Sequence, residues 1–430
     1  MSKNYFTRNF STLILCLGIF TSAFAQIVPG GVFVLNEGGA GSDNASVSFL
    51  VPDQPNAITN LYTAANPGAT LGNVAQSMSF NGDYAYIVLN VSNAVKVVNR
   101  NTFELVATVN TGLNNPRYMA FHNGKGYITN WGGASATDDY IAILDLETNT
   151  LTGTIPVEMG VERILTYNGK LYAAHQGGFD YNNLLSVIDP GTNTVEETIE
   201  VGDIPNRMII RDGFLYVICS GNPMWAPTET DGSLVKIDLA DNAIVETTTY
   251  AGLHPSNLNI DTEGNFYFTS DADIFKASLT TPAVYNEIAS LSAQGAYGIY
   301  GMDMIDNKLY VADAGNYVSP GTAYIFSTMG EQLNSYEVGV IPNSFYKAES
   351  TMGTPGHNKA QFALYPNPAK ERFYLDTDNA DIAIYDITGK EVLKGHYTAS
   401  GISVSNLPSG MYMVKISGEA GTAVKKLIVE

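Results

Sequence analysis

Gly202-Asp-Ile-Pro-Asn-Arg-Met-Ile-Ile-Arg-Asp-Gly-Phe-Leu-Tyr-Val-Ile-Cys-Ser220 is the clearest copy of a pattern that returns along most of the 430-residue chain. It begins as a loop, continues into the apolar run 208–210, turns at Asp212-Gly213 and enters a second apolar run, 214–219. Two short apolar runs joined by an Asp-Gly or Asn-Gly turn are typical of a β-hairpin. We therefore expect two antiparallel strands here and wherever the pattern recurs.

The pattern recurs in seven registers. The clearest other copies are residues 115–130 and 161–175, and both contain an Asn-Gly-Lys turn. An aromatic residue in the second run marks each copy, at Phe33, Tyr86, Tyr127, Tyr172, Tyr216, Tyr267 and Tyr310. The steps between these positions are 53, 41, 45, 44, 51 and 43 residues. A period in the forties with four strands per period is typical of β-propeller blades.

The two ends of the array predict how the ring closes. The first copy, Gly31-Val-Phe-Val-Leu-Asn36, has no first strand of its own. The missing strand reappears at the far end, where residues 339–346 closely repeat residues 202–209. If this last segment supplies the innermost strand of the first blade, the ring has no exposed sheet edge. We therefore expect an all-β fold, with a seven-bladed propeller over residues 26–347 whose repeats start near residue 30.

Three short motifs carry a family resemblance. Tyr127-Ile-Thr-Asn130, the Asn-Gly-Lys turns and the turn Asp189-Pro-Gly-Thr-Asn-Thr194 are similar to those of YVTN-type seven-bladed propellers of surface and periplasmic proteins. The resemblance covers the whole array. It implies the same fold as the period does, and an extracytoplasmic location.

Residues 1–25 have the pattern of a signal peptide. Lys3 and Arg8 precede an apolar run, 13–20, which is followed by the small-x-small sequence Ala23-Phe-Ala25. We expect the mature chain to begin at Gln26, outside the cytoplasm. A membrane anchor is the less favoured alternative, because the run is shorter than the ~20 residues that span a bilayer. Removal of the peptide leaves Cys219 as the one cysteine, so no internal disulfide is expected.

The composition changes after the array. Residues 348–361 are small, polar and without period, and we interpret them as a linker. Residues 362–430 alternate apolar residues between turns, which indicates a small β-sandwich. They contain Tyr365-Pro-Asn-Pro368, Asp386-Ile-Thr-Gly-Lys390 and Leu407-Pro-Ser-Gly-Met-Tyr412, in that order. This set strongly resembles the C-terminal sorting domain of the type IX secretion system of Bacteroidetes. The resemblance implies export by that machinery, then release or surface attachment; an ordinary accessory sandwich is the alternative.

The charge is unevenly distributed and limits the partners. The whole chain has a formal net charge of −20, but residues 26–346 contain 11 Lys and Arg against 33 Asp and Glu, a net of −22. Residues 362–430 are nearly balanced, with 7 against 8. A strongly acidic module disfavours nucleic acid and anionic membranes as partners. We expect a soluble, exported monomer.

The first strand of each blade starts at the mouth of the central channel, where propellers commonly bind ligands. The residues expected there are Ser344, Gln76, Arg117, Arg163, Arg207, Asn257 and Tyr300. Three arginines on consecutive blades are notable because the array contains only five. A desolvated guanidinium requires an acceptor. These arginines either pair internally, with Glu162 as a nearby acceptor, or bind a ligand carboxylate or phosphate.

The second strands end at the same face, and all seven end in polar residues, including Asn130, His175 and Asp313. Any one of these is explained by a strand meeting water. The loops that follow contain aromatic and apolar side chains, namely Trp131, Phe179, Tyr181, Met224, Trp225 and Tyr317. Such residues on a rim favour recognition, because they provide large and stiff contact areas. Self-packing of the loops is the alternative.

These features predict an exported, non-enzymatic propeller that binds a ligand at its loop face. The predicted ligand-binding set is Gln76, Arg117, Arg163, Arg207, Asn257, Asn130, His175, Trp131, Trp225, Tyr181 and Tyr317. We predict no catalytic or metal-ligating residue and specify no cofactor. Within the resembled family, some Bacteroidetes propellers capture cobalamin for an outer-membrane transporter, so a cobalamin-like cofactor or another small anionic molecule is the expected ligand. Those proteins resemble lipid-anchored ones, whereas this chain has no lipid-attachment motif, which weakens the expected transporter partnership.

Two other functions remain open. One is a metal-dependent hydrolase or lactonase that uses Asn130, Asp313 and their neighbours around the channel. That reading lacks a Gly-x-Ser-x-Gly elbow and a recognisable calcium-loop pattern. The other is an adhesion module whose rim aromatics contact a glycan or a protein.

Overall fold

A computed structural model describes residues 27–135, 137–349, 364–375, 380–386, 390–398, 401–418 and 421–430. The chain divides into two compact units, one ending at Ser350 and one beginning at Thr351. The predicted signal peptide and most of the predicted linker lie outside the described residues. No helix within the described ranges is long and apolar enough to cross a membrane.

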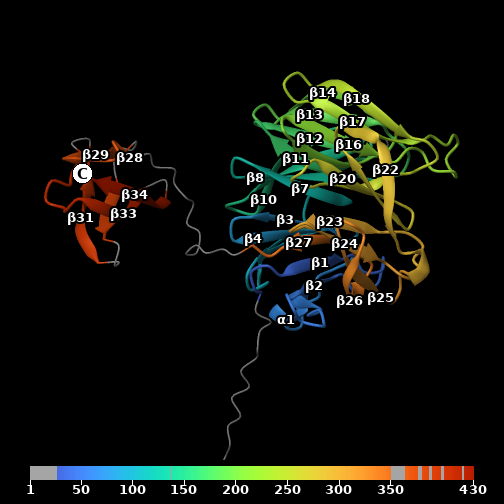
Figure 1. The fold of residues 1–430 in the computed structure, drawn as a ribbon, viewed down its shortest axis with the longest axis horizontal. Coiled ribbons are helices and arrows are strands. Elements are labelled where there is room, and N and C mark those ends of the chain that lie inside the picture. Colours follow the sequence, from blue (N-terminus) through green and yellow to red (C-terminus); the bar gives the residue numbers. More distant parts are fainter. Residues whose placement is uncertain are drawn as a thin grey trace, which may run out of the picture. The chain divides into compact units, whose positions relative to one another are not determined.

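The first unit is a seven-bladed β-propeller (Figure 1). Six blades are four-stranded antiparallel sheets whose strands follow one another in the chain, from the channel outward. Blades two to four contain β3 (Ala75–Asn81), β4 (Tyr84–Leu89), β5 (Ala94–Asn99), β6 (Leu105–Val109), β7 (Pro116–His122), β8 (Lys125–Asn130), β9 (Tyr140–Asp145), β10 (Thr150–Pro156), β11 (Val161–Tyr167), β12 (Lys170–His175), β13 (Leu184–Asp189) and β14 (Thr194–Glu200).

Blades five to seven repeat this arrangement. They contain β15 (Pro205–Arg211), β16 (Phe214–Cys219), β17 (Gly232–Asp238), β18 (Ala243–Tyr250), β19 (Ser256–Ile260), β20 (Asn265–Ser270), β21 (Asp273–Ser278), β22 (Thr281–Ser290), β23 (Gly301–Ile305), β24 (Lys308–Asp313), β25 (Pro320–Ser327) and β26 (Gln332–Val340). A short helix α1 (Leu61–Ala65) and a 3-10 turn (Ser292–Gln294) lie in connections.

Blade one closes the ring as the sequence predicts. Its sheet consists of β2 (Ser46–Leu50), β1 (Val32–Asn36) and β27 (Pro342–Lys347), the last strand of the propeller. β27 pairs antiparallel with β1, with Val34 opposite Phe345. A single bridge between Phe49 and Ile58 extends the sheet outward. The N-terminal and C-terminal ends of the array are therefore hydrogen-bonded to each other.

The blades form because their middle strands are buried on both faces. In β16 every residue after Phe214 is buried, and the strand is a continuous apolar run. A strand covered on both sides by neighbouring sheets requires this pattern, whereas a half-exposed strand alternates. The Asp212-Gly213 turn that precedes it has φ of 51° and 82°, the left-handed pair that a two-residue hairpin turn requires.

The second unit is a small β-sandwich, again as predicted. One sheet contains β28 (Leu364–Tyr365), β29 (Arg372–Leu375) and β32 (Ile402–Ser403). The other contains β31 (Glu391–Tyr397), β30 (Ala380–Tyr385), β33 (Gly410–Gly418) and β34 (Gly421–Val429). Phe373 and Ile384, one from each sheet, are both fully buried in its core.

Candidate functional site

The inner strands β7, β11 and β15 each contain a β-bulge near their start, which separates the predicted arginine ring into two rows. In β7, Pro116 pairs with Asn130 and Met119 with Ile128, so two residues lie opposite Thr129. β11 and β15 repeat this irregularity. Aligned on the pairing, the first bulge residue is Arg117, Glu162 or Asn206, and the second is Tyr118, Arg163 or Arg207. Arg117 thus lies one row nearer the strand start than Arg163 and Arg207.

The first row contains a buried ion-pair network, which we call the loop-end cluster: Glu37, Arg117, Trp131, Glu162 and Tyr300. Arg117 donates to both oxygens of Glu162, from Nε and Nη2, at 2.9 Å each. Its guanidinium also stacks 3.8 Å from the centre of the Trp131 ring. Burial alone would lower the pKa of Arg117, but the charge and hydrogen bonds of Glu162 raise it above its ordinary value. Arg117 is therefore a paired, permanently charged side chain.

Glu37 is the second carboxylate of this cluster. It accepts hydrogen bonds from Tyr300 Oη at 2.8 Å and from Asn343 Nδ2 at 3.0 Å. Burial raises its pKa above the ordinary value, against the opposing effect of these two donors and of Arg117. The side chains of the cluster satisfy one another, apart from the buried indole Nε1 of Trp131, which has no partner among the described residues.

Arg207, in the second row, crosses the channel to blade seven. Its guanidinium donates to the Met302 carbonyl at 2.7 Å and to the Asp303 carboxylate. Asp303 also accepts the Phe345 backbone N–H at 2.8 Å. This ion pair joins blades five and seven across the channel.

Arg163 differs from both. No hydrogen bond or ion pair of its guanidinium occurs within the part of the chain that the structure describes; its neighbour is the Tyr118 ring, 4.4 Å away. Burial by itself lowers the pKa of Arg163, while the Tyr118 hydroxyl and the charge of Asp303 raise it, and the net direction is upward. The side chain is therefore a charged cation that lacks an acceptor.

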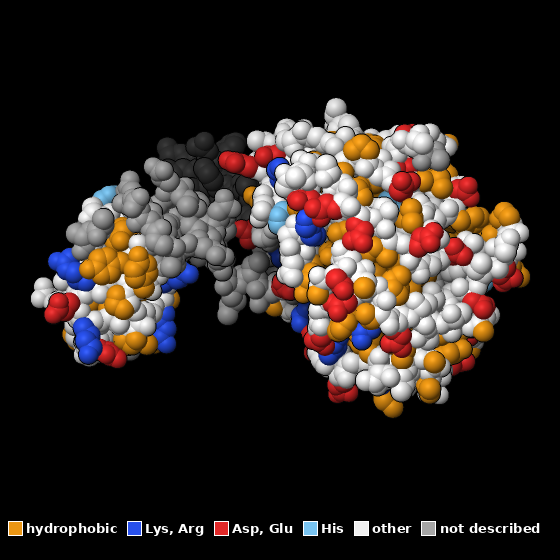
Figure 2. Space-filling model, turned by 90° about the horizontal axis from the view of Figure 1, so that it is seen from above, with side chains coloured by type: hydrophobic (Ala, Val, Ile, Leu, Met, Phe, Trp, Pro, Cys, Tyr) orange, Lys and Arg blue, Asp and Glu red, His pale blue; other side chains and the backbone are white. Residues whose placement is uncertain are grey.

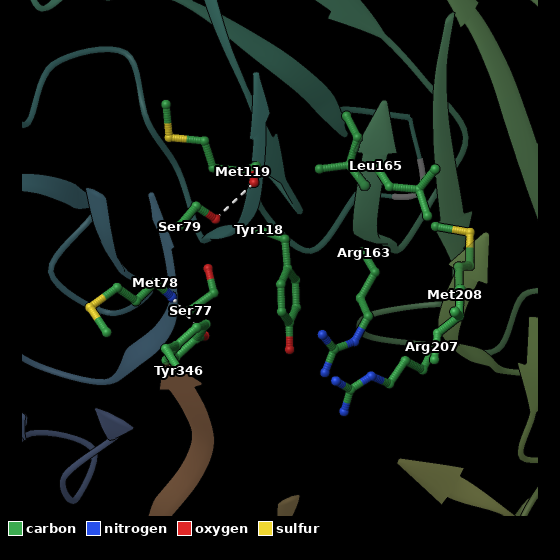
Figure 3. A pocket seen from close by; sticks show the side chains of 12 residues that line it. Ser77, Met78, Ser79, Tyr118, Met119, Arg163, Leu165, Arg207, Met208 and Tyr346 are labelled. Carbon is green, nitrogen blue, oxygen red and sulfur yellow. Dashed lines mark hydrogen bonds between the residues drawn. The ribbon is translucent and has the colours of Figure 1, made fainter. Parts of the chain in front are cut away.

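Arg163 lines a cavity of about 270 Å³ in the channel (Figure 3). We call it the channel cavity. Its walls are central residues of the inner strands of blades one to five: Ser77, Met78, Ser79, Tyr118, Met119, Arg163, Ile164, Leu165, Arg207, Met208, Ile209 and Tyr346. In Figure 3, Tyr118, Arg163 and Arg207 point toward a common space, whereas the Met78 and Met119 side chains point away from it. The guanidinium and hydroxyl groups therefore share the interior with apolar side chains.

The hydroxyls around the cavity are partly engaged. Ser77 and Ser79 donate to the Arg117 and Met119 carbonyls, at 2.7 and 2.9 Å, and so join blades two and three. Tyr346 accepts the Met78 backbone N–H at 3.0 Å, and burial raises its pKa to about 12. Tyr118 accepts from Gln76 Nε2 at 3.4 Å and keeps its own proton to donate.

Four predicted polar residues are used by the scaffold. Asn130 donates to the Ile128 carbonyl at 2.8 Å and accepts the Asn114 N–H at 3.1 Å. His175 is fully buried between the Glu158 carbonyl and the Ser186 hydroxyl, each at 2.8 Å, and burial lowers its pKa to about 4. Asn257 donates to the Thr269 hydroxyl at 3.0 Å, and Gln76 donates to the Tyr118 hydroxyl at 3.4 Å. None of the four lines the channel cavity.

The loop face includes the loops 111–115, 131–135 with 137–139, 158–160, 176–183, 220–231 and 314–319. Its predicted aromatics do not form one site. Trp131 is held between Arg117 and Phe179, and Tyr317 packs edge-on against Tyr300 at 5.8 Å. Tyr181 is half-buried, whereas Trp225 is 78% exposed. The rim is thus divided between aromatics that cover the loop-end cluster and a free tryptophan.

Asp313, named for the hydrolase alternative, accepts the Gly315 N–H at 2.8 Å and ends its strand in a turn. In the described ranges, no three His, Cys, Asp or Glu side chains are grouped so that they could hold a metal ion. The residues that sequence reasoning missed are Glu37, Tyr118, Asp303 and Tyr346. The sequence contained a signal for Tyr118 alone, because it directly follows Arg117.

Comparisons with known proteins agree with the two-unit architecture. Residues 30–338 match the model of a family described as a domain of unknown function, DUF5074. The chain belongs to this family. The DUF5074 region coincides with the propeller repeats, and residues 363–430 match the secretion system C-terminal sorting domain. The sorting domain directs type IX export to the cell surface or the extracellular space, and it implies contact with the secretion machinery.

One curated relative and one solved structure support the propeller fold of this DUF5074 protein. The seven-bladed beta-propeller protein Rv1057 of Mycobacterium tuberculosis is 29% identical over 142 residues, which cover 32% of this chain and 34% of that protein. The chain thus matches only about a third of this curated relative. A functionally unknown protein from Desulfotomaculum acetoxidans superposes with a TM-score of 0.51 at 10% identity, over 74% of this chain and 99% of that one. The Pan2 WD40 domain of Neurospora crassa gives 0.49 at 11% identity, over 69% and 89%.

Proposed function

We propose that this protein is an exported, non-enzymatic propeller that captures a small anionic molecule in its central channel. The observation that carries the proposal is the contrast among the three arginines. Arg117 and Arg207 have carboxylate partners, whereas Arg163 faces the channel cavity with no acceptor in the described residues.

A guanidinium in this position favours an anion for energetic reasons. Arg163 is partly buried, so its charge has lost part of its hydration without gaining a protein partner, and a ligand oxygen would supply one. Each charge-assisted hydrogen bond contributes about 1.5–3 kcal/mol, and the planar fork of arginine binds two carboxylate or phosphate oxygens at once. The Tyr118 hydroxyl is a further donor beside Arg163.

The acidic exterior makes this site unusual for the molecule. Figure 2 shows Asp and Glu side chains spread over the visible face of the propeller, with few Lys and Arg among them. An anion is repelled by that surface at long range but meets two guanidinium groups inside the channel cavity. Capture therefore depends on the local field of Arg163 and Arg207, and we expect binding to be modest in rate and selective for small ligands.

Binding of a cobalamin-like ligand stays a prediction, and such a ligand would bind outside the channel cavity. Ligand pockets commonly measure about 300–1,000 Å³. The channel cavity, at about 270 Å³, lies just below that range. A corrinoid is far larger than such a cavity and would have to lie on the loop face, where Trp225 is free. The expected outer-membrane transporter partner depends on the same surface.

The test is calorimetry and thermal shift of the mature chain with acetate, succinate, inorganic phosphate and cobalamin, each added separately. We expect at least one small anion to bind, with affinity lost in Arg163→Gln and kept in Arg211→Gln. Arg211 is the matched control because it donates to the Thr262 carbonyl at 2.7 Å and does not line the cavity. Absence of any anion binding that depends on Arg163 would refute the proposal.

A second function, recognition of a glycan or protein by the rim, is favoured by one observation. Met224 and Trp225 are 75% and 78% exposed, on the loop that follows blade five's second strand. Exposed tryptophans are common binding hot spots. A glycan array probed with wild type and with Trp225→Ala separates this function from small-molecule capture. If the rim recognises a glycan, wild type gives a signal that Trp225→Ala loses.

A further inference from the structure

The charges around the channel cavity do not balance. Arg163 and Arg207 both line it, and the carboxylate paired with Arg207 is Asp303. Glu162, also near Arg163, is already bound by Arg117 through two hydrogen bonds. Both charged residues in the cavity lining are arginines, and the Asp303 carboxylate bound to Arg207 lies behind that lining. With the Arg117–Glu162 pair neutral, Arg163, Arg207 and Asp303 bring two positive charges and one negative charge to the site. The site has a net charge of +1.

A single negative charge on the ligand therefore completes the site. A neutral ligand would leave Arg163 without a counter-charge, and a dianion would bring a second charge that nothing in the walls neutralises. Excess charge of either sign is unfavourable where water is scarce and the effective dielectric constant is low. Because the Asp303 carboxylate is occupied by Arg207 and by the Phe345 N–H, it does not rearrange to adjust the balance.

The size of the cavity limits the rest of the ligand. An apolar cavity of about 150 Å³ accepts benzene, and one water molecule occupies about 30 Å³ of liquid. A cavity of about 270 Å³ is therefore filled by roughly nine or ten non-hydrogen atoms. Leu165 and Ile209 contribute apolar groups to the lining, and Tyr118 and Tyr346 contribute hydroxyls.

The planar fork of Arg163 matches a carboxylate in shape as well as charge. We infer that the channel cavity selects a small monocarboxylate, with its carboxylate on Arg163 and its body between Tyr118, Leu165 and Ile209. This inference rests on the proposed capture of an anion in the channel and specifies its chemical class.

The probes are three molecules of nearly equal size and shape that differ in charge: succinamide, succinamate and succinate. Calorimetry of the full chain at neutral pH is expected to rank succinamate first, with succinamide and succinate each weaker by about tenfold or more. Arg163→Gln should abolish the preference for succinamate over succinamide. Tighter binding of succinate or of inorganic phosphate than of succinamate, still dependent on Arg163, would overturn the monocarboxylate inference but leave anion capture intact. If neither these probes nor acetate and inorganic phosphate bind in an Arg163-dependent manner, both the inference and the proposed anion capture fail.

A charge-shift pair of variants sharpens the result. Asp303→Asn raises the net charge of the site to +2 and should move the preference from succinamate to succinate. The double variant Arg207→Met with Asp303→Asn restores +1 and should restore the preference for succinamate. Circular dichroism and thermal unfolding verify that each variant is folded. A preference for succinamate that stays the same in folded Asp303→Asn contradicts the charge argument, even if the double variant behaves as wild type.

Discussion

Arg117 and Arg163 lie on adjacent blades, and a single step along a β-bulge gives them opposite environments. Arg117, in the loop-end cluster, has two hydrogen bonds to Glu162 and a tryptophan stacked on it. Arg163, in the channel cavity, has an aromatic neighbour but no acceptor. The same residue type therefore serves stability at one end of the channel and remains available for binding in its middle. Pairing, and not residue identity, separates the two roles.

The largest expected effect is at the loop-end cluster. Arg117→Met leaves Glu162 as an unpaired buried carboxylate, which should lower the free energy of unfolding by about 3–5 kcal/mol. Chemical denaturation of the full chain, followed through the unfolding of the propeller, measures this loss. The double variant Arg117→Met with Glu162→Met removes both charges and should recover most of the loss. If Arg117→Met is as stable as wild type, Arg117 contributes no more to stability than Arg163, and the contrast between the two arginines is wrong.

His175, one of the polar residues that end the second strands, tests whether these residues are buried parts of the scaffold, as Arg117 is. Burial lowers the pKa of His175 to about 4, whereas an unfolded histidine has a pKa of about 6.5. Since the unfolded chain takes up the proton first, the stability contributed above pH 6.5 is lost as the pH falls toward 4. The loss amounts to about 3 kcal/mol.

His175→Gln removes that titration. The difference in unfolding free energy between wild type and the variant should shrink as the pH falls from neutral toward 4. Denaturation curves across this range measure the difference, because other titrating groups cancel in the comparison. If this difference in unfolding free energy does not change with pH, His175 takes up a proton as easily in the folded protein as in the unfolded chain and is therefore not buried.

Arg207 is expected to lie between the two extremes. Arg207→Met removes its bonds to Met302 and Asp303 but leaves Asp303 its hydrogen bond from the Phe345 N–H. We expect a loss of about 2–3 kcal/mol in unfolding free energy. Adding Asp303→Asn should return about half of it. An effect as large as that of Arg117→Met would mean that the cross-channel pair, and not the loop-end cluster, dominates the stability of the ring.

Arg163 should show the smallest effect on stability. Arg163→Gln breaks no hydrogen bond in the described residues, removes a cation–π contact worth about 0.5–1 kcal/mol, and relieves repulsion with Arg207. The net change in unfolding free energy should stay within about 1 kcal/mol. Denaturation without added anion measures it. A loss comparable to that of Arg207→Met would indicate an internal acceptor and remove the basis for ligand capture.

The repeat in the sequence was sufficient for the architecture but not for the site. The likeness of residues 339–346 to residues 202–209 predicted both the blade count and the pairing of β27 with β1, because a closed ring has one way to satisfy a missing inner strand. The bulge was not visible, since an extra residue in a strand changes neither the period nor the apolar pattern enough to notice. The sequence therefore placed Arg117 in the same row as Arg163 and Arg207.

The pairing of side chains across the channel could not be predicted from local sequence patterns, for a different reason. Arg207 and Asp303 are 96 positions apart, and Tyr300 and Glu37 are 263 apart. Such contacts are set by the radius of the ring and by side-chain direction, which no spacing rule within a blade encodes. Trp225 shows the converse case, because an exposed loop residue was predicted from its neighbours alone and is 78% exposed.

The position of β27 also imposes an order in time. Gly339 donates to Asn36 across 303 positions, so the ring stays open until the strand at residues 342–347 has been made. The sorting domain follows that strand in the chain. Because synthesis runs from the N-terminus, no chain presents its sorting domain before it contains every strand of the propeller. The export signal is therefore made only after every strand of the propeller that it exports.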